Sequence, residues 1–93
     1  MMLKVYSVRD NKTGDFNVPF FEQNDVQATR MFHKLCNDDR VQIAHFPDDF
    51  DMYCIGLFDD KSGKLESFAA PEFMVAATSF KKLVDKEEKE RRK

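Results

Sequence analysis

Two short polar segments of nearly the same sequence constrain the fold of this chain more than any other feature. Asp10-Asn11-Lys12-Thr13-Gly14 and Asp59-Asp60-Lys61-Ser62-Gly63 both begin with Asp and end with Gly. An Asp that opens a turn accepts hydrogen bonds from the backbone that follows it, and a Gly supplies positive φ at the exit. Apolar segments flank both turns. The pattern therefore predicts two β-hairpins.

The similarity extends beyond the turns as a weak internal repeat. When residues 10–35 are shifted by forty-nine positions onto 59–84, six identities appear. They are Asp10/Asp59, Lys12/Lys61, Gly14/Gly63, Val26/Val75, Ala28/Ala77 and Thr29/Thr78. Each half then reads as strand, turn, strand and helix.

The residues of each half support this assignment. The strands are expected over 3–9, 16–20, 52–58 and 65–69, and the helices near 24–36 and 71–88. Asn24 is expected to cap the first helix, with Ala28, Met31, Phe32 and Leu35 as its buried stripe. Pro71 suits the first turn of the second helix, where its missing N–H has no cost. A short extra strand is expected over 41–44.

The predicted fold class is α+β. It is a ββα–ββα pseudo-repeat in which an antiparallel sheet carries both helices on one face. A chain of 93 residues forms one domain at most, which we place at residues 1–85. The remainder, 86–93, is a charged C-terminal tail without an apolar residue.

The repeat also predicts the two faces of the sheet. Tyr6 and Val8 align with Ile55 and Leu57, so these four side chains are expected to meet the helices. The alternate residues of these strands point to the other face of the sheet and are also apolar. Two helices on one face cannot cover this second face as well. Its apolar residues are Leu3, Val5, Met52, Cys54 and Phe58. Such a face suggests a dimer interface or a ligand-stacking surface, and we expect it to be buried against another copy in a homodimer.

Composition excludes several classes of protein. Fifteen basic and seventeen acidic side chains give a net charge of −2, which excludes a strongly cationic nucleic-acid coat. No apolar run approaches the ~18–20 residues of a membrane span, so no membrane partner is expected. Two cysteines are too few for a secreted disulfide scaffold and suit a reducing cytosol. No catalytic motif and no cofactor-binding motif is present, so the sequence predicts a protein that is not an enzyme.

Two clusters of polar residues nevertheless resemble metal sites. Asp48, Asp49 and Asp51 could hold a divalent ion in a nuclease, but solvated loop charges are the simpler interpretation. Zinc ligands could be drawn from His33, Cys36, His45 and Cys54. Their spacing differs from the paired ligands of zinc fingers, and we therefore predict no metal site.

Basic residues interleaved with aromatic ones form the strongest functional signal. Cations neutralise phosphates and aromatic rings stack on unpaired bases, which is how single-stranded nucleic acid is held. The candidate residues are Lys4, Tyr6, Arg9, Lys12, Phe16, Lys61, Lys64, Arg91 and Arg92. The alternative is that these aromatic rings belong to the core and that the cations are ordinary surface residues.

The ordered residues of the chain resemble a known family. The string Tyr6-Ser7-Val8-Arg9-Asp10-x-Lys12-x-Gly14-x-Phe16 begins the match, and Pro19-Phe20 follows it. It continues with Ala28-x-Arg30-x-Phe32, Asn37-Asp38 and Phe46-Pro47-x-Asp49-Phe50-x-x-Tyr53-x-Ile55-Gly56-x-Phe58-Asp59. Together they resemble the small nonstructural protein of gokushoviruses, which are single-stranded-DNA bacteriophages of the Microviridae.

The resemblance implies a DNA-binding protein that serves production or packaging of the single-stranded genome. It also implies the cytoplasm of the bacterial host. We therefore expect a single-stranded-DNA-binding homodimer acting in phage genome replication or packaging. The alternative is an interaction module that regulates replication or assembly by binding another phage protein, without contacting DNA.

Overall fold

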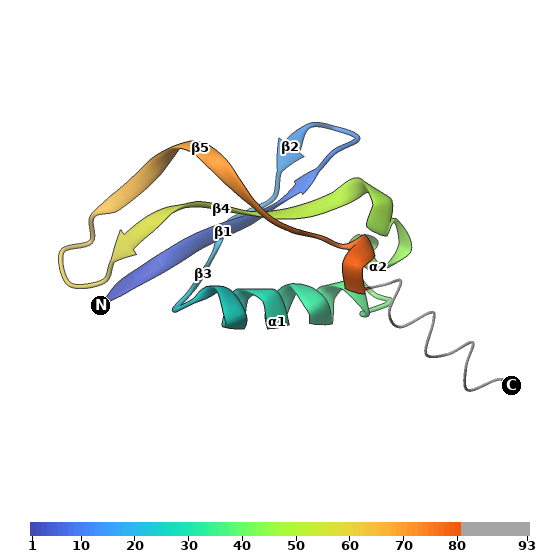
Figure 1. The fold of residues 1–93 in the computed structure, drawn as a ribbon, viewed down its shortest axis with the longest axis horizontal. Coiled ribbons are helices and arrows are strands. Elements are labelled where there is room, and N and C mark those ends of the chain that lie inside the picture. The colour runs from blue at the N-terminus through green and yellow to red at the C-terminus, as the bar shows by residue number, and fades with distance from the viewer. Residues whose placement is uncertain (81–93) are drawn as a thin grey trace, which may run out of the picture.

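The computed structural model describes residues 1–80 as a curled antiparallel sheet with one main helix on one face (Figure 1). The strand order is β2-β1-β4-β5, and β3 also pairs with β1. The strands are β1 (Met2–Asp10), β2 (Asp15–Phe16), β3 (Phe20–Glu22), β4 (Phe50–Asp59) and β5 (Leu65–Ala76). The helices are α1 (Asp25–Cys36), the short α2 (Gln42–His45) and the 3₁₀ turn η1 (Pro47–Asp49). The α+β class is therefore confirmed.

Both hairpin turns form as predicted, and their hydrogen bonds match. The Gly14 N–H donates to the Asp10 carbonyl and the Gly63 N–H to the Asp59 carbonyl, each at 2.8 Å. The two glycines have φ of 80° and 75°, a region that favours glycine. The two turns therefore share one local structure.

The two halves differ beyond their turns. The return strand of the first hairpin is interrupted at Pro19, which lacks the N–H that a ladder requires, and splits into β2 and β3. The return strand of the second hairpin, β5, instead continues for twelve residues. The predicted helix start at Pro71 is therefore wrong, because residues 71–76 belong to β5. A helical turn appears only at 78–80, and the rest of the predicted helix lies outside the described residues.

Strand pairing explains why Pro71 does not begin a helix. Glu72 and Phe73 pair with Cys54 and Tyr53 of β4, whereas Ser67 pairs with Gly56. Residues 68–71 therefore form an irregularity opposite Ile55. Pro71, which has no backbone N–H, is not paired with a residue of β4 there. After the irregularity, Phe73 pairs with Tyr53 and Val75 pairs with Met52. These pairs of apolar and aromatic residues favour a strand over a helix.

The main helix agrees with its prediction in bounds and cap. The Asn24 side chain accepts a hydrogen bond from the Gln27 N–H at 2.9 Å. Ala28, Phe32 and Cys36 are buried against the sheet. Met31, predicted to be buried, is 40% exposed because it lies on the outer side of the helix. The strand predicted over 41–44 is also wrong, since this segment enters α2.

A register shift between β1 and β4 corrects the predicted faces in part, because Tyr6 and Val8 lie as predicted but Met52, Cys54 and Ile55 of β4 change sides. Val5 pairs with Gly56 but Tyr6 pairs with Cys54, so Ile55 is an extra residue in β4. A bulge reverses the side to which the following residues point. Met52 and Cys54 consequently lie in the core beside α1, with Tyr6 and Val8. Ile55, predicted to meet the helices, lines cavities on the other face.

Candidate nucleic-acid interface

An exposed row of aromatic rings crosses the sheet face that α1 does not cover. The rings of Phe16 and Tyr53 lie 5.5 Å apart with an interplanar angle of 67°, and those of Tyr53 and Phe73 lie 5.8 Å apart at 81°. Such edge-to-face contacts are favourable for aromatic pairs. The row runs from β2 across β1 to β4 and β5. Its last step follows the sheet, because Phe73 of β5 pairs with Tyr53 of β4.

A second aromatic pair lies farther along the same face. Phe21 of β3 and Phe58 of β4 contact edge to face, with ring centroids 5.4 Å apart. Val5, which pairs with Phe21, lies between these strands and is buried. We call the surface of Phe16, Phe21, Tyr53, Ile55, Phe58 and Phe73 the open face.

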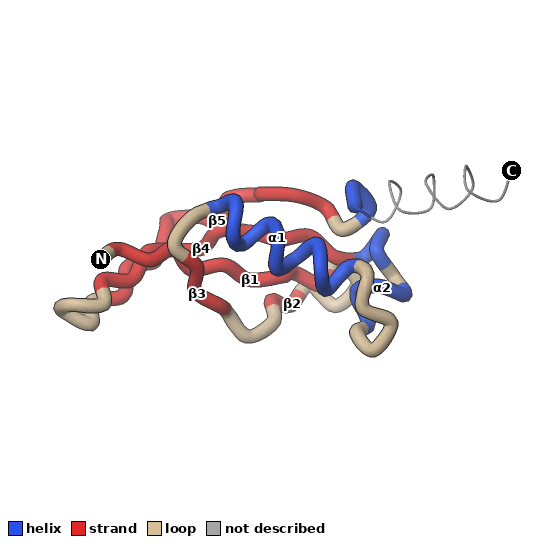
Figure 2. Tube along the Cα trace, turned by 90° about the horizontal axis from the view of Figure 1, so that it is seen from below, coloured by secondary structure: helices blue, strands red, loops and turns tan. Residues whose placement is uncertain are grey.

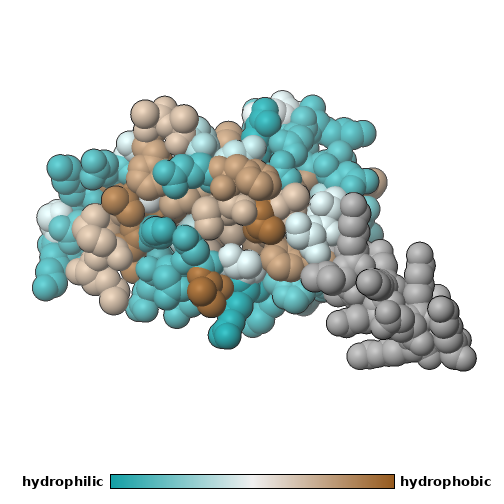
Figure 3. All heavy atoms as spheres, in the orientation of Figure 1, coloured by the Kyte–Doolittle hydropathy of each residue, from teal (hydrophilic) through white to brown (hydrophobic). Residues whose placement is uncertain are grey.

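The open face is hollowed and accessible. Phe16, Phe21 and Phe73 are 42%, 44% and 59% exposed, so each ring offers a surface to a ligand. A cavity of about 270 Å³ is lined by Phe16, Ile55 and the arch of β5 around Pro71. In Figure 1, β5 and the β1–β2 hairpin rise on the side of the sheet away from α1. Figure 3 shows hydrophobic side chains across the middle of the molecule.

The predicted hairpin cations lie at the two ends of the sheet. Arg9 and Lys12 belong to the first hairpin, and Lys61 and Lys64 to the second. The antiparallel register of β1 and β4 sends the two turns in opposite directions, as the tube in Figure 2 also shows. The cations therefore flank the open face and do not form one continuous track.

The cations differ in their availability. The Arg9 guanidinium donates to the Asn11 side chain at 3.1 Å, and Asn11 in turn donates to Asp51 at 2.8 Å. The side chains of Lys12, Lys61 and Lys64 form no ion pair within residues 1–80. These three ammonium groups can bind phosphates without breaking an existing ion pair.

Lys4 and Tyr6 are placed on the helix side of the sheet. The Tyr6 hydroxyl donates to the Asp25 carboxylate at 2.6 Å, and the Lys4 ammonium donates to the same oxygen at 3.0 Å. Tyr6 is fully buried and stacks on Phe20, so its ring has no surface on which a base could stack. Both residues therefore fasten the start of α1 to β1.

This network makes the stability of the fold sensitive to acid. The hydrogen bond from Tyr6, followed by that from Lys4, lowers the pKa of Asp25 in the folded state. A lowered carboxyl pKa stabilises the fold above the unfolded-state pKa, and that stabilisation is lost as pH falls through the folded-state pKa.

We therefore expect Tyr6→Phe to lower the free energy of unfolding at pH 7 by about 1–3 kcal/mol, since it removes a hydrogen bond to a charged group. The difference between the variant and the wild type should shrink as pH falls below about 4, the unfolded-state pKa of an aspartate, and through the lowered folded-state pKa of Asp25. Urea unfolding at pH 7 and pH 3 measures both values. A difference that is equal at the two pH values would contradict this role of Asp25.

Comparison with known proteins identifies the family. A family model described as Phage ORF5 protein matches residues 3–80. The chain belongs to this family. It is therefore a bacteriophage protein. The comparisons with curated proteins and with solved structures found no match.

In this Phage ORF5 protein, the two predicted site residues not yet placed lie outside the residues that the structure describes. Arg91, Arg92 and the tail 86–93 lie beyond residues 1–80. No helix within the described part of the chain is long and apolar enough to cross a membrane.

The acidic and zinc-like clusters of the Phage ORF5 protein are dispersed. Within residues 1–80, no three His, Cys, Asp or Glu side chains are grouped to hold a metal ion. Asp51 accepts a hydrogen bond from Asn11. Asp49 instead lines a cavity beside the first hairpin turn. His33 stacks on Phe80, and both cysteines are buried in the core. Burial raises the pKa of the Cys54 thiol, which disfavours the thiolate that a metal would need.

Sequence reasoning missed three aromatic residues of the open face: Phe21, Tyr53 and Phe73. Phe58 was assigned to the correct face, as part of a dimer interface or a ligand-stacking surface. Tyr53 and Phe73 could have been found only with the register of β4 against β5. That register depends on a bulge that no local pattern marks.

Proposed function

We propose that this phage protein binds single-stranded DNA and acts in genome replication or packaging in the cytoplasm of the bacterial host. The observation that carries the proposal is the open face, an exposed aromatic row flanked at both ends by lysines that form no ion pair within residues 1–80. The sequence resemblance to the nonstructural protein of gokushoviruses supports the same function.

The open face suits unpaired bases. Stacking of a base on an aromatic side chain contributes about 1–3 kcal/mol and tolerates any sequence. Phe73, Phe16 and Phe21 offer separate rings along the sheet. The nine residues of β1 span about 30 Å, so a strand lying along this face reaches the cations at both ends.

The same geometry disfavours duplex DNA. In a duplex the bases are stacked on one another and present only their edges in the grooves. The rings of Phe16, Tyr53 and Phe73 could then not reach a base surface. We therefore expect selectivity for single strands.

The proposal includes a homodimer, because one copy carries few cations for a phosphate chain. The surface predicted for this contact does not carry the dimer, since Met52 and Cys54 are in the core and Phe58 belongs to the open face. We expect light scattering to give a dimer mass at micromolar concentration. A monomer mass, alone and with DNA, would remove the dimer from the proposal.

A titration of labelled oligo(dT) monitored by fluorescence anisotropy tests the function. Arg9, Lys12, Lys61 and Lys64 neutralise up to about four phosphates per copy, so log K should fall with log salt at a slope of about −3. A duplex of equal length serves as the control and should bind more weakly. Absence of binding to oligo(dT) in 20–50 mM salt, or equal binding of the duplex, would contradict the proposal.

A second function is favoured by the net charge. At −2 the chain is weakly repelled by DNA as a whole, and an exposed apolar surface also suits a protein partner. In this alternative the open face docks another phage protein that controls replication or assembly. Failure to bind DNA at low salt would favour it.

A further inference from the structure

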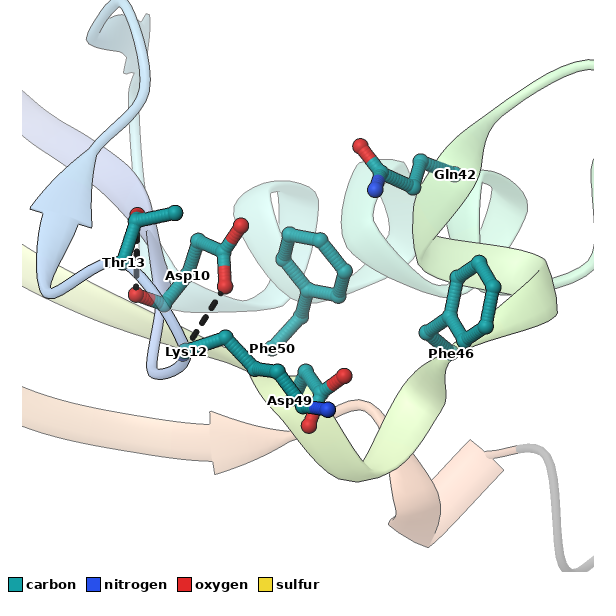
Figure 4. A pocket seen from close by; sticks show the side chains of 7 residues that line it. All are labelled: Asp10, Lys12, Thr13, Gln42, Phe46, Asp49 and Phe50. Carbon is teal, nitrogen blue, oxygen red and sulfur yellow. Dashed lines mark hydrogen bonds between the residues drawn. The ribbon is translucent and has the colours of Figure 1, made fainter.

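A cavity of about 290 Å³ lies at one end of the sheet, beside the first hairpin turn (Figure 4). Its walls come from that turn and from the segment that joins α1 to β4. The lining residues are Asp10, Lys12, Thr13, Gln42, Phe46, Asp49 and Phe50. Its volume is at the lower end of the ~300–1,000 Å³ typical of small-ligand pockets.

Backbone hydrogen bonds hold the two walls together. The Asn11 N–H donates to the Asp49 carbonyl at 2.7 Å, and Asp10 pairs with Phe50 in the sheet. The Lys12 N–H donates to the Asp10 carboxylate at 2.9 Å. The cavity is therefore shaped before any ligand binds.

The lining groups combine stacking with hydrogen bonding. Phe46 is 54% exposed, although its neighbour Phe50 is buried in the core. Figure 4 shows Asp10 and Gln42 with the ring of Phe50 between them. Within residues 1–80, the side chains of Asp49, Gln42 and Lys12 form no hydrogen bond with another protein group. An acceptor, an amide and a cation are thus available beside an aromatic ring.

We propose that this cavity binds a guanine base, with Phe46 stacking on it and the Asp49 carboxylate accepting its N–H groups. The proposal rests on the proposed function, because it gives the single-strand-binding protein a preferred base. The same guanine chemistry is present in a DNA strand and in a free nucleotide such as dGMP.

Guanine fits these groups better than the other bases do. Its Watson–Crick edge presents two adjacent donors, N1–H and the N2 amino group, which one carboxylate can accept together. The O6 acceptor is left for the donors of Gln42 or Lys12, which line the same cavity. Cytosine and adenine offer a carboxylate only one amino group, and thymine offers two carbonyls around one N–H.

The test compares two fluorescein-labelled fifteen-nucleotide strands, oligo(dT) and the same strand with three central dG residues. A bidentate contact discriminates between bases by about 1–3 kcal/mol, so the wild type should bind the dG strand about tenfold tighter. Asp49→Asn should abolish this preference and leave binding of oligo(dT) at least as strong. Asp48→Asn removes the same charge from an exposed position outside the cavity and should keep the preference.

Each outcome decides between the claims. Equal binding of both strands by the wild type overturns the guanine pocket and leaves the proposed function standing. No binding of either strand overturns both claims. Loss of the preference in both aspartate variants would show a charge effect and also overturn the pocket. Competition by dGMP but not by dTMP would show that the pocket accepts the free nucleotide.

Discussion

Replacing Phe16, Tyr53 and Phe73 together by leucine is expected to weaken binding of oligo(dT) by at least about a hundredfold. Each base that stacks on a ring gains about 1–3 kcal/mol, and leucine keeps an apolar surface without the ring face. The three side chains lie on the exposed side of the sheet, so the fold should persist. Circular dichroism and anisotropy on the same samples measure fold and binding.

A matched pair of substitutions on the opposite side of the molecule controls this experiment. Val26 and Met31 are 63% and 40% exposed on the outer side of α1. Changing both to alanine removes a comparable apolar surface and should leave affinity for oligo(dT) unchanged. Wild-type affinity in the folded triple variant would refute the open face as the DNA-binding surface.

Gly56→Ala should cause the largest loss of stability among single substitutions of a glycine. A Cβ at this position would lie 2.3 Å from the Glu66 carbonyl oxygen, a backbone atom of the paired strand β5. Relief of this contact requires β5 to move away from β4, which we expect to lower the free energy of unfolding by about 2–3 kcal/mol. For a domain of this size the melting temperature would fall by about 10–20 °C.

Gly63→Ala is the control for this substitution. Gly63 has a φ of 75°, but within residues 1–80 no atom other than those of Gly63 and its two chain neighbours lies within 4 Å of a Cβ added there. The variant therefore reports only the cost of the backbone conformation, about 1 kcal/mol. An equal loss of stability in the two variants would contradict close strand packing at Gly56. Gly56→Ala should also weaken DNA binding, because β5 carries Phe73.

Features that depend on neighbouring residues could be predicted from the sequence. Asp10 and Gly14 define one turn without help from the rest of the chain, and Asn24 caps α1 by the same local logic. The hairpins and the bounds of α1 were therefore correct. The cations Lys12 and Lys61 were rightly placed at the turn tips.

Features that depend on strand pairing could not be predicted. The extra residue Ile55 moves Met52 and Cys54 into the core, and only the register of β4 against β1 shows it. Pro71 is compatible with a helix start and with a break in a strand ladder, and the pairing of Phe73 with Tyr53 decides between them. The repeat correctly predicted that Tyr6 meets the helices, but Tyr6 was also assigned to DNA, because a buried tyrosine and an exposed one look alike in a sequence.

An NMR titration of the ¹⁵N-labelled protein with oligo(dT) tests the central claim most directly. Binding on the open face predicts saturable shift changes at the amides of Phe16, Tyr53 and Phe73, with Val26 and Met31 unaffected. Shift changes confined to α1, or none at micromolar to millimolar DNA in low salt, would contradict the account.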